Sequence, residues 1–119
     1  LYIISRSELP RLSPNDMLMV ANIARYHRKN IPRASHPDFM RLSQTDRQRT
    51  TDLAAILRVA DALDRAHLKH VESVQVIAAG KDVFLRLEGP GDFVLERWAL
   101  SQKKSLFEKT FGKSVSIAL

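Results

Sequence analysis

The sequence contains no cysteine and no long run of apolar residues. The lack of cysteine excludes disulfide bonds and thiolate metal sites, and it agrees with a reducing cytoplasm, where we expect the protein to reside. No run approaches the roughly 18 consecutive apolar residues that a membrane span requires, so we expect no membrane partner. A glycine-rich phosphate loop, a nucleophile elbow and an H-E-x-x-H zinc pattern are also missing from the sequence. No complete catalytic signature is therefore visible.

Aromatic residues account for only 7% of the 119 residues. Tyr26 and Trp98 are isolated in the sequence and do not form the row of rings on which single-stranded nucleic acid stacks. We therefore do not expect nucleic acid as a partner. A basic helical module that binds nucleic acid stays open as an alternative, and a binding measurement with duplex DNA would test it.

Positive charge is concentrated in the first part of the chain. Residues 1–70 contain 12 Lys/Arg and 7 Asp/Glu, residues 71–119 contain 7 and 6, and the formal net charge is +6. Such an excess is typical of a polyanion partner, although it also serves solubility. The segment IARYHRK supplies Arg25, Arg28 and Lys29, and Arg33 follows. These side chains would bind phosphate oxygens without reading a base sequence, unless they form only a solvated helix face.

A first helix is predicted to begin after the N-cap residue Ser13, with Pro14 at its first position, and to run to about Lys29. Helical spacing predicts one core-facing side, made of Val20, Ile23, Ala24 and His27. Residues 30–42 contain two prolines and predict a loop with one short helical turn.

A second helix is predicted through residues 46–67, capped by Ser43 and Asp46. Its predicted apolar stripe consists of Leu53, Ile56, Leu57, Ala60 and Leu63. On the same helical wheel Asp64 falls within the stripe and Asp61 at its margin.

A buried carboxylate at Asp64 would need a partner, because burying a charge costs several kcal/mol unless it is paired or hydrogen-bonded. One interpretation is a structural ion pair or hydrogen bond to His27, an arginine or a backbone amide. The other is a metal site built from imidazole and carboxylate groups, but two ligands are too few for it. We expect Asp64 to be a structural polar residue between the helices.

After residue 70 the period of the sequence changes from helical to alternating. Two strands are predicted at residues 71–80 and 82–89, followed by a helix at 93–111 and a strand at 114–119. The order predicts an α+β fold with a helical body, residues 1–70, and a small β-β-α-β subdomain, residues 71–119.

Three stretches together, YIISRSEL, IARYHRK and LAAILRVADALDRAH, give the sequence a family likeness. It resembles the C-terminal region of the Ppx/GppA exopolyphosphatase and guanosine pentaphosphate phosphatase family. The resemblance implies a helical domain related to the HD metal-dependent phosphohydrolases and a small α/β subdomain. It also implies an actin-like N-terminal half that carries the active site. Because the sequence opens on LYIISRSEL, we expect an excised C-terminal module without that half.

The resemblance also assigns residues. Asp61 matches the aspartate that is the last metal ligand in HD enzymes, and His27 matches the histidine of the RYHRK segment. The other HD ligands are not in the sequence. The resemblance therefore implies relic positions, and we expect no catalytic residue, metal or cofactor in this chain. A metal-dependent HD phosphohydrolase that lacks its first ligands is the alternative.

The resemblance implies that the full protein hydrolyses phosphoanhydride bonds with a divalent cation, Mg or Mn. For this chain it implies channel contacts to polyphosphate or guanosine pentaphosphate through Arg25, Arg28 and Lys29, with Arg33 nearby. It further implies contacts to the actin-like N-terminal domains of the same protein, and a homodimer.

Overall fold

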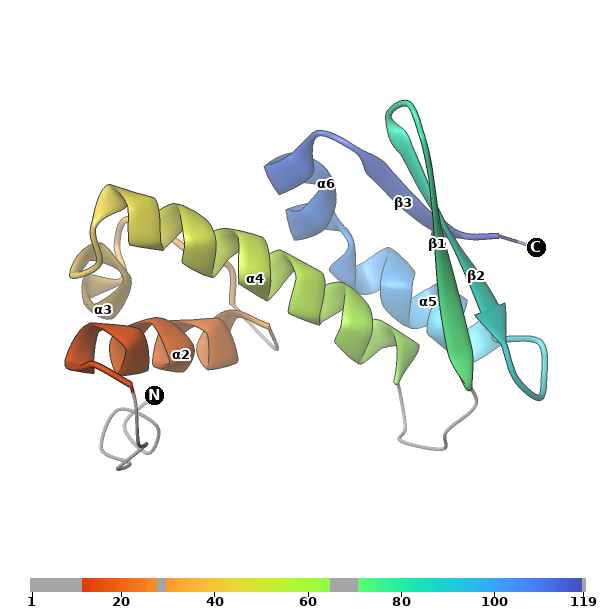
Figure 1. The fold of residues 1–119 in the computed structure, drawn as a ribbon, viewed down its shortest axis with the longest axis horizontal. Helices are drawn as coiled ribbons and strands as arrows, with labels where there is room; N and C mark the ends of the chain where they lie inside the picture. The colour runs from red at the N-terminus through yellow and green to blue at the C-terminus, as the bar shows by residue number, and fades with distance from the viewer. Residues whose placement is uncertain (1–11, 28–29, 65–70, 119) are drawn as a thin grey trace. The chain divides into compact units, whose positions relative to one another are not determined.

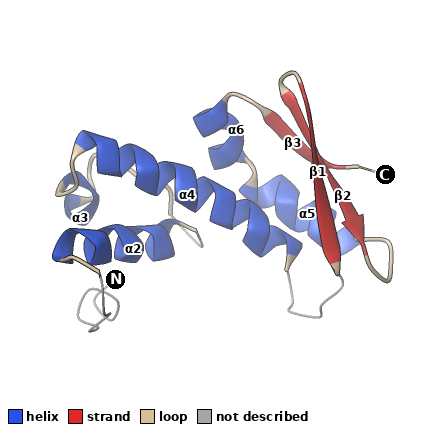
Figure 2. Ribbon diagram, in the orientation of Figure 1, coloured by secondary structure: helices blue, strands red, loops and turns tan. Residues whose placement is uncertain are grey.

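The computed structural model describes residues 12–27, 30–64 and 71–118. The chain divides into two compact units, the first ending at Ala54 and the second beginning at Ala55. The first unit is helical, and the second contains helices and a small three-stranded sheet (Figures 1 and 2). This confirms the predicted α+β class. The predicted domain boundary after residue 70 falls at the end of residues 65–70, which lie outside the described part.

The described elements are, in chain order, α2 (Pro14–Tyr26), α3 (Pro37–Met40), α4 (Gln44–Leu63), β1 (Ser73–Ala79), β2 (Asp82–Glu88), α5 (Val94–Lys103), α6 (Ser105–Phe111) and β3 (Ser114–Ile117). The helix α4 contributes residues to both units. No described helix is both long enough and apolar enough to cross a bilayer.

Local capping sets the start of α2, as the sequence predicts. The Ser13 hydroxyl accepts a hydrogen bond from the Asp16 backbone N–H at 3.0 Å, and the Ser13 N–H donates to the Asp16 carboxylate at 3.2 Å. Pro14 follows, where its missing N–H costs nothing. The helix ends at Tyr26, earlier than predicted, with His27 as its C-cap.

The start of α4 is capped in the same way. The Ser43 hydroxyl accepts a hydrogen bond from the Asp46 N–H at 3.1 Å. The Asn15 side-chain amide donates to the Asp46 carboxylate at 2.9 Å, which joins the beginnings of α2 and α4. The Arg47 guanidinium donates to the Leu42 carbonyl at 2.9 Å, just beyond the end of α3. Backbone ends that would otherwise lack partners are therefore satisfied by side chains.

The core of the first unit lies between α2 and α3. Tyr26 is fully buried, and its ring meets that of Phe39 edge to face, with centroids 5.7 Å apart and planes at 88°. The buried Asn22 amide donates to the carbonyls of Leu18 and Asp38, at 2.9 and 3.3 Å. Its amide group therefore joins α2 to α3.

The core-facing side predicted for α2 is partly wrong. The fully buried residues are Ala21, Asn22 and Tyr26, whereas the predicted Val20 is 37% exposed. The other predicted residues, Ile23, Ala24 and His27, are half-buried. The buried side is therefore rotated toward the side chains that meet α3.

The apolar stripe predicted for α4 is largely wrong. Leu53, Ile56 and Leu57 are 46, 47 and 42% exposed, and Ala60 is exposed as well. Leu63 is half-buried and packs against the core of the second unit. The buried positions of this helix are Thr50, Ala54, Ala55, Arg58, Val59 and Ala62. Small side chains let a neighbouring element approach closely, so they can mark the packed face even when larger apolar residues lie elsewhere.

The second unit is built on a hairpin and a crossover. β1 and β2 pair antiparallel around a turn in which Gly80 adopts φ 59°, a conformation that favours glycine. β3 pairs with β2 in parallel, giving the order β1-β2-β3. A parallel neighbour requires a long connection, which α5 and α6 provide. The predicted single helix at 93–111 is two helices, with Lys104 between them.

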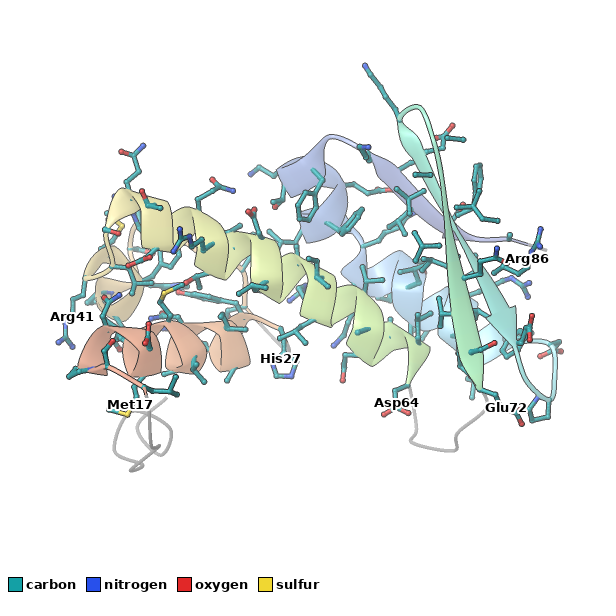
Figure 3. The ribbon with its side chains drawn as sticks, viewed as in Figure 1. Met17, His27, Arg41, Asp64, Glu72 and Arg86 are labelled. Carbon is teal, nitrogen blue, oxygen red and sulfur yellow. The ribbon has the colours of Figure 1, made fainter. Side chains whose placement is uncertain are left out.

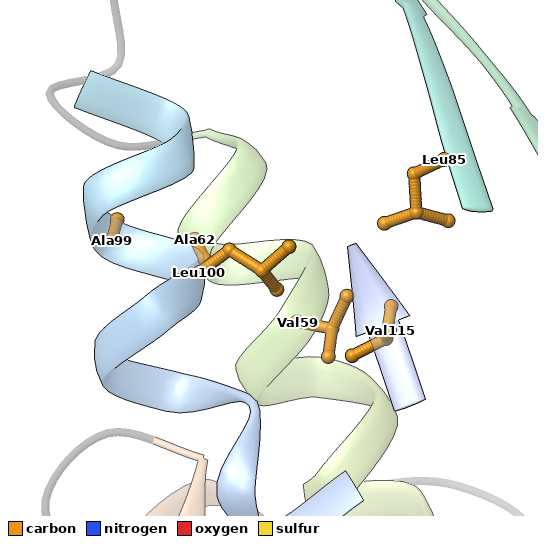
Figure 4. Close-up of a cluster of buried hydrophobic side chains, with 6 residues drawn as sticks. All are labelled: Val59, Ala62, Leu85, Ala99, Leu100 and Val115. Atoms are coloured by element: carbon orange, nitrogen blue, oxygen red, sulfur yellow. The ribbon is translucent and has the colours of Figure 1, made fainter. Parts of the chain in front are cut away.

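The core of the second unit lies between the sheet and its helices. Val59 and Ala62 of α4 pack with Leu85 of β2, Leu100 of α5 and Val115 of β3 (Figure 4). All five side chains are at most 9% exposed. The alternating residues Val83 and Leu87 pack against this cluster on either side of Leu85, so one face of β2 points to the core.

Candidate polyanion site

The sequence from residue 17 to residue 37 contains no Asp or Glu. It begins inside α2, crosses the following loop and ends at the start of α3. All four predicted polyanion-binding residues lie within it: Arg25, Arg28, Lys29 and Arg33. Arg28 and Lys29 lie outside the described residues. The site can therefore be described around Arg25 and Arg33.

Tyr26 and His36 hold the two ends of this segment together. The Tyr26 hydroxyl lies 2.6 Å from Nδ1 of His36, and the two rings stack with centroids 5.5 Å apart and planes at 14°. Because Tyr26 is buried at the end of α2, this contact fixes the His36 ring relative to the helix.

Arg25 and Arg33 lie close to this stacked pair. The Arg25 guanidinium carbon is 5.4 Å from the centroid of the Tyr26 ring, within the range of a cation–π contact. The His36 backbone N–H donates to the Arg33 carbonyl at 3.0 Å, so a tight turn places Arg33 beside His36. We call Arg25, Tyr26, Arg33 and His36 the cationic cluster.

Within the described part of the chain, neither Arg25 nor Arg33 forms an ion pair with a carboxylate. Elsewhere in the first unit, Arg41 lies 3.7 Å from Asp38 and Arg49 lies 3.9 Å from Asp46. The positive charge of the cluster is thus not neutralised by described side chains.

The two ionisable rings of the cluster respond to this environment. Burial lowers the pKa of His36 below its ordinary value, and the charges of Arg25 and then Arg33 lower this pKa further. Burial raises the pKa of Tyr26, against the opposing effect of Arg25 and with a smaller contribution from Asp38. Both rings are therefore held in their neutral forms near neutral pH. The cluster disfavours an additional positive charge on His36, as expected where the charges of nearby arginines are not neutralised by carboxylates.

His27 and Asp61, which the sequence resemblance predicts to be relic HD positions, lie in different units. His27 is half-buried at the end of α2, where its backbone N–H donates to the Ile23 carbonyl at 3.1 Å (Figure 3). In the second unit, the Asp61 carboxylate lies 2.7 Å from Nζ of Lys103 on α5. The side chains of Asp61 and Lys103 are 24 and 15% exposed, so this ion pair is shielded from water.

The Lys103 ammonium therefore already provides the positive charge next to Asp61. A divalent ion at Asp61 would lie beside this ammonium and be repelled by it. Among residues 12–27, 30–64 and 71–118, no three His, Cys, Asp or Glu side chains converge on a point where they could hold a metal ion. The described side chains thus do not fit the metal centre of HD enzymes.

The predicted inward position of Asp64 is wrong. Asp64 is exposed at the C-terminal end of α4 (Figure 3). Its backbone N–H donates to the carbonyls of Ala60 and Asp61, which is typical of a final helical turn. The desolvation argument that required a structural partner for Asp64 consequently does not hold.

Sequence reasoning missed Tyr26, His36 and Lys103 as parts of these arrangements. Tyr26 and His36 are ten residues apart, and Asp61 and Lys103 are 42 apart. The only available signal was the position of Tyr26 and His36 within the acid-free segment. Lys103 gave none.

Comparison with known families adds the decisive observation. Residues 1–109 match the family model of the Ppx/GppA phosphatase, domain III. The chain belongs to the Ppx/GppA phosphatase family. The resemblance noted from the sequence is therefore confirmed, and this Ppx/GppA domain is a module of an exopolyphosphatase-like protein. No curated protein matches the chain.

Proposed function

We propose that this Ppx/GppA domain binds a phosphate polyanion, either polyphosphate or guanosine pentaphosphate, on its first unit. One observation supports this proposal. Arg25 and Arg33 both lie close to the Tyr26–His36 ring pair, in a segment that contains no acidic residue, and neither has a described carboxylate partner. Arg28 and Lys29 belong to the same acid-free segment of the sequence, and the proposal includes them on that ground.

The chemistry of these side chains suits such a ligand. A guanidinium donates several hydrogen bonds in a plane and matches the oxygens of a phosphate group. Clustered cations also displace counterions from a polyanion, which makes the affinity strongly dependent on salt. Neither property selects a base sequence, so the surface would retain a phosphate chain by its charge.

We propose that the hydrolysis itself takes place in actin-like domains of the full protein, with Mg or Mn. The Asp61–Lys103 pair supports this assignment, because it uses the relic carboxylate for an internal contact. In that arrangement the present domain forms part of the channel along which the substrate lies. The alternative, an HD-type hydrolase, needs a free Asp61 carboxylate for a metal ion.

We also propose that the domain forms a homodimer. Large apolar side chains are exposed in the second unit, among them Leu57 of α4 and Trp98 of α5, at 42 and 57%. Exposed apolar side chains mark an interaction surface when they form one contiguous patch, and the dimer proposal requires that they do so. Light scattering coupled to size exclusion should give twice the mass of one chain, and a monomer mass at high protein concentration would contradict the dimer.

The binding proposal is tested with the 119-residue chain and a fluorescently labelled long-chain polyphosphate, followed by anisotropy at fixed ionic strength. The double variant Arg25→Gln/Arg33→Gln should bind about tenfold more weakly, because two phosphate contacts are lost. Each lost phosphate contact contributes roughly 0.7–0.9 to the slope of log affinity against log salt, so this slope should be shallower by about 1.5. Reversal of Arg25, Arg28 and Lys29 to Glu should weaken binding further.

The matched control is Arg41→Gln/Arg49→Gln, which removes the same charge from arginines that have aspartate partners. This control should change the affinity by less than about twofold. Equal losses in both double variants would contradict a defined site and indicate only general charge attraction. Competition with guanosine pentaphosphate and with duplex DNA then identifies the ligand class. Phosphoester cleavage with manganese that stops in Asp61→Ala would instead favour the HD-type hydrolase.

A further inference from the structure

His36 belongs to the cationic cluster but is absent from the predicted binding residues. Its Nδ1 is engaged by the Tyr26 hydroxyl, while its Nε2 makes no hydrogen bond to any described residue. The imidazole is half-buried and close enough to Arg25 and Arg33 for both positive charges to act on it. One nitrogen is thus fixed by the fold, and the other is available to a ligand.

The hydrogen bond to Tyr26 determines which nitrogen carries the proton of the neutral ring. Because burial raises the pKa of Tyr26, its hydroxyl keeps its proton near neutral pH. The 2.6 Å contact fits either tautomer of His36, and we assign the one in which this O–H donates to an unprotonated Nδ1 of the neutral ring. The single ring proton then resides on Nε2, which presents an N–H donor.

We propose that His36 is a contact residue of the polyanion site and that binding of a polyphosphate chain there adds one proton from solvent to its imidazole. The inference rests on the proposed function. The proton is added at Nδ1, and the Tyr26 hydroxyl turns from donor to acceptor of the same 2.6 Å hydrogen bond. The Nε2–H group continues to donate to a phosphate oxygen, now from a cationic ring.

The charges around His36 account for this coupling. Arg25 from α2 and Arg33 from the loop oppose protonation in the free protein, and Tyr26 is neutral. On α3, Asp38 acts on Tyr26 and is itself 3.7 Å from Arg41. A bound polyphosphate would neutralise the two arginines and add negative charge beside the ring. Both changes favour the imidazolium form, so binding and protonation reinforce each other.

The proposal predicts tighter binding at lower pH. Affinity of the full chain for long-chain polyphosphate should rise about fivefold from about pH 8 to about pH 5.5, which spans the ordinary pKa of histidine. The internal phosphates of a long chain keep a constant charge over this range. In His36→Gln the rise should disappear, because glutamine offers an N–H donor but takes up no proton in this pH range.

Calorimetry in two buffers of different ionisation enthalpy counts the protons directly. The wild-type chain should take up a fraction of a proton near about pH 6.5, and His36→Gln should take up distinctly less. The matched control is His27→Gln, which removes the other described histidine and should keep the proton uptake. An NMR titration should show the pKa of His36 rising when polyphosphate is added.

The outcomes separate this inference from the function on which it rests. If wild type and His36→Gln bind polyphosphate with the same pH dependence and proton uptake, His36 is not coupled to the ligand, and the proposed function stands. If the wild-type chain does not bind polyphosphate at any pH tested, the proposed function itself is wrong. Loss of the pH response in Arg25→Gln/Arg33→Gln, with weakened binding, agrees with both.

Discussion

The two units of this domain place their charged groups differently. In the first unit Arg25 and Arg33 have no described carboxylate partner, and residues 1–54 contain nine Lys/Arg and five Asp/Glu. In the second unit the Asp61 carboxylate forms an ion pair with Lys103, and the Asp82 carboxylate accepts a hydrogen bond from the Ser114 hydroxyl at 2.6 Å. Residues 55–119 contain ten Lys/Arg and eight Asp/Glu.

This difference separates two uses of charge. The Glu108 carboxylate accepts a hydrogen bond from the Val115 backbone N–H at 3.0 Å and so joins α6 to β3. Carboxylates of the second unit therefore join different parts of the fold: the partners of Asp61 and Asp82 are 42 and 32 residues away, and that of Glu108 is seven residues away. In the first unit the cations around Tyr26 and His36 are positioned by rings and a turn, which leaves their charge for a ligand.

The largest effect on stability is expected at the internal pair of the second unit. Asp61→Ala should lower the free energy of unfolding by about 1–2 kcal/mol, because it leaves the Lys103 ammonium without its 2.7 Å partner in a shielded position. Urea denaturation monitored by circular dichroism measures the change. A double-mutant cycle with Lys103→Met isolates the coupling between the two side chains.

The matched control is Asp64→Ala, three residues further along the same chain segment. Because Asp64 is exposed at the end of α4, its loss should change the free energy of unfolding by less than about 0.5 kcal/mol. A larger loss for Asp64→Ala than for Asp61→Ala would show that the second unit does not use Asp61 as its structural carboxylate.

Asp61 is half-buried and Asp64 is exposed, which is the opposite of the helical-wheel prediction and shows what the sequence could and could not predict. Helix caps were predictable because they depend on neighbouring residues, as at Ser13 and Ser43. The β-β-α-β order was predictable from the change in period. These features are local, and so is the chemistry that specifies them.

The buried face of α4 was not predictable in the same way. Leu53, Ile56 and Leu57 are large apolar residues and suggest one packed side, whereas the residues that are in fact buried include the small Ala54, Ala55 and Ala62. Only the neighbouring elements decide between these sides. The contacts of Lys103 with Asp61 and of Tyr26 with His36 likewise depend on how distant elements meet. Arg25 and Arg33 could be proposed from composition, but the ring pair between them could not.

A smaller effect, with a defined direction in pH, is expected in the first unit. The pKa of His36 is lowered in the folded chain, chiefly by burial and then by Arg25 and Arg33. The unfolded chain therefore takes up the proton first as the pH falls below about 6.5. The stability associated with neutral His36 is present above that value and is lost as the pH falls through the lower folded-state pKa.

Thermal melts of wild type and His36→Gln across this pH range measure the difference. The wild-type chain should lose more stability than the variant on acidification, and saturating polyphosphate should reduce that loss. If melting temperature depends on pH in the same way in both proteins, the surroundings of His36 do not disfavour its charged form. The first unit would then lack the uncompensated positive charge that distinguishes it from the second unit.

The smallest effect is expected at a surface pair of the first unit. Arg41 and Asp38 lie 3.7 Å apart with side chains 69 and 40% exposed, so water screens their attraction. Arg41→Gln should change the free energy of unfolding by less than about 0.5 kcal/mol in urea denaturation. Because this pair and Asp61–Lys103 join the same kinds of charge, shielding and distance account for the difference between them. A loss above about 1 kcal/mol in Arg41→Gln would mean that exposed pairs also hold the first unit together.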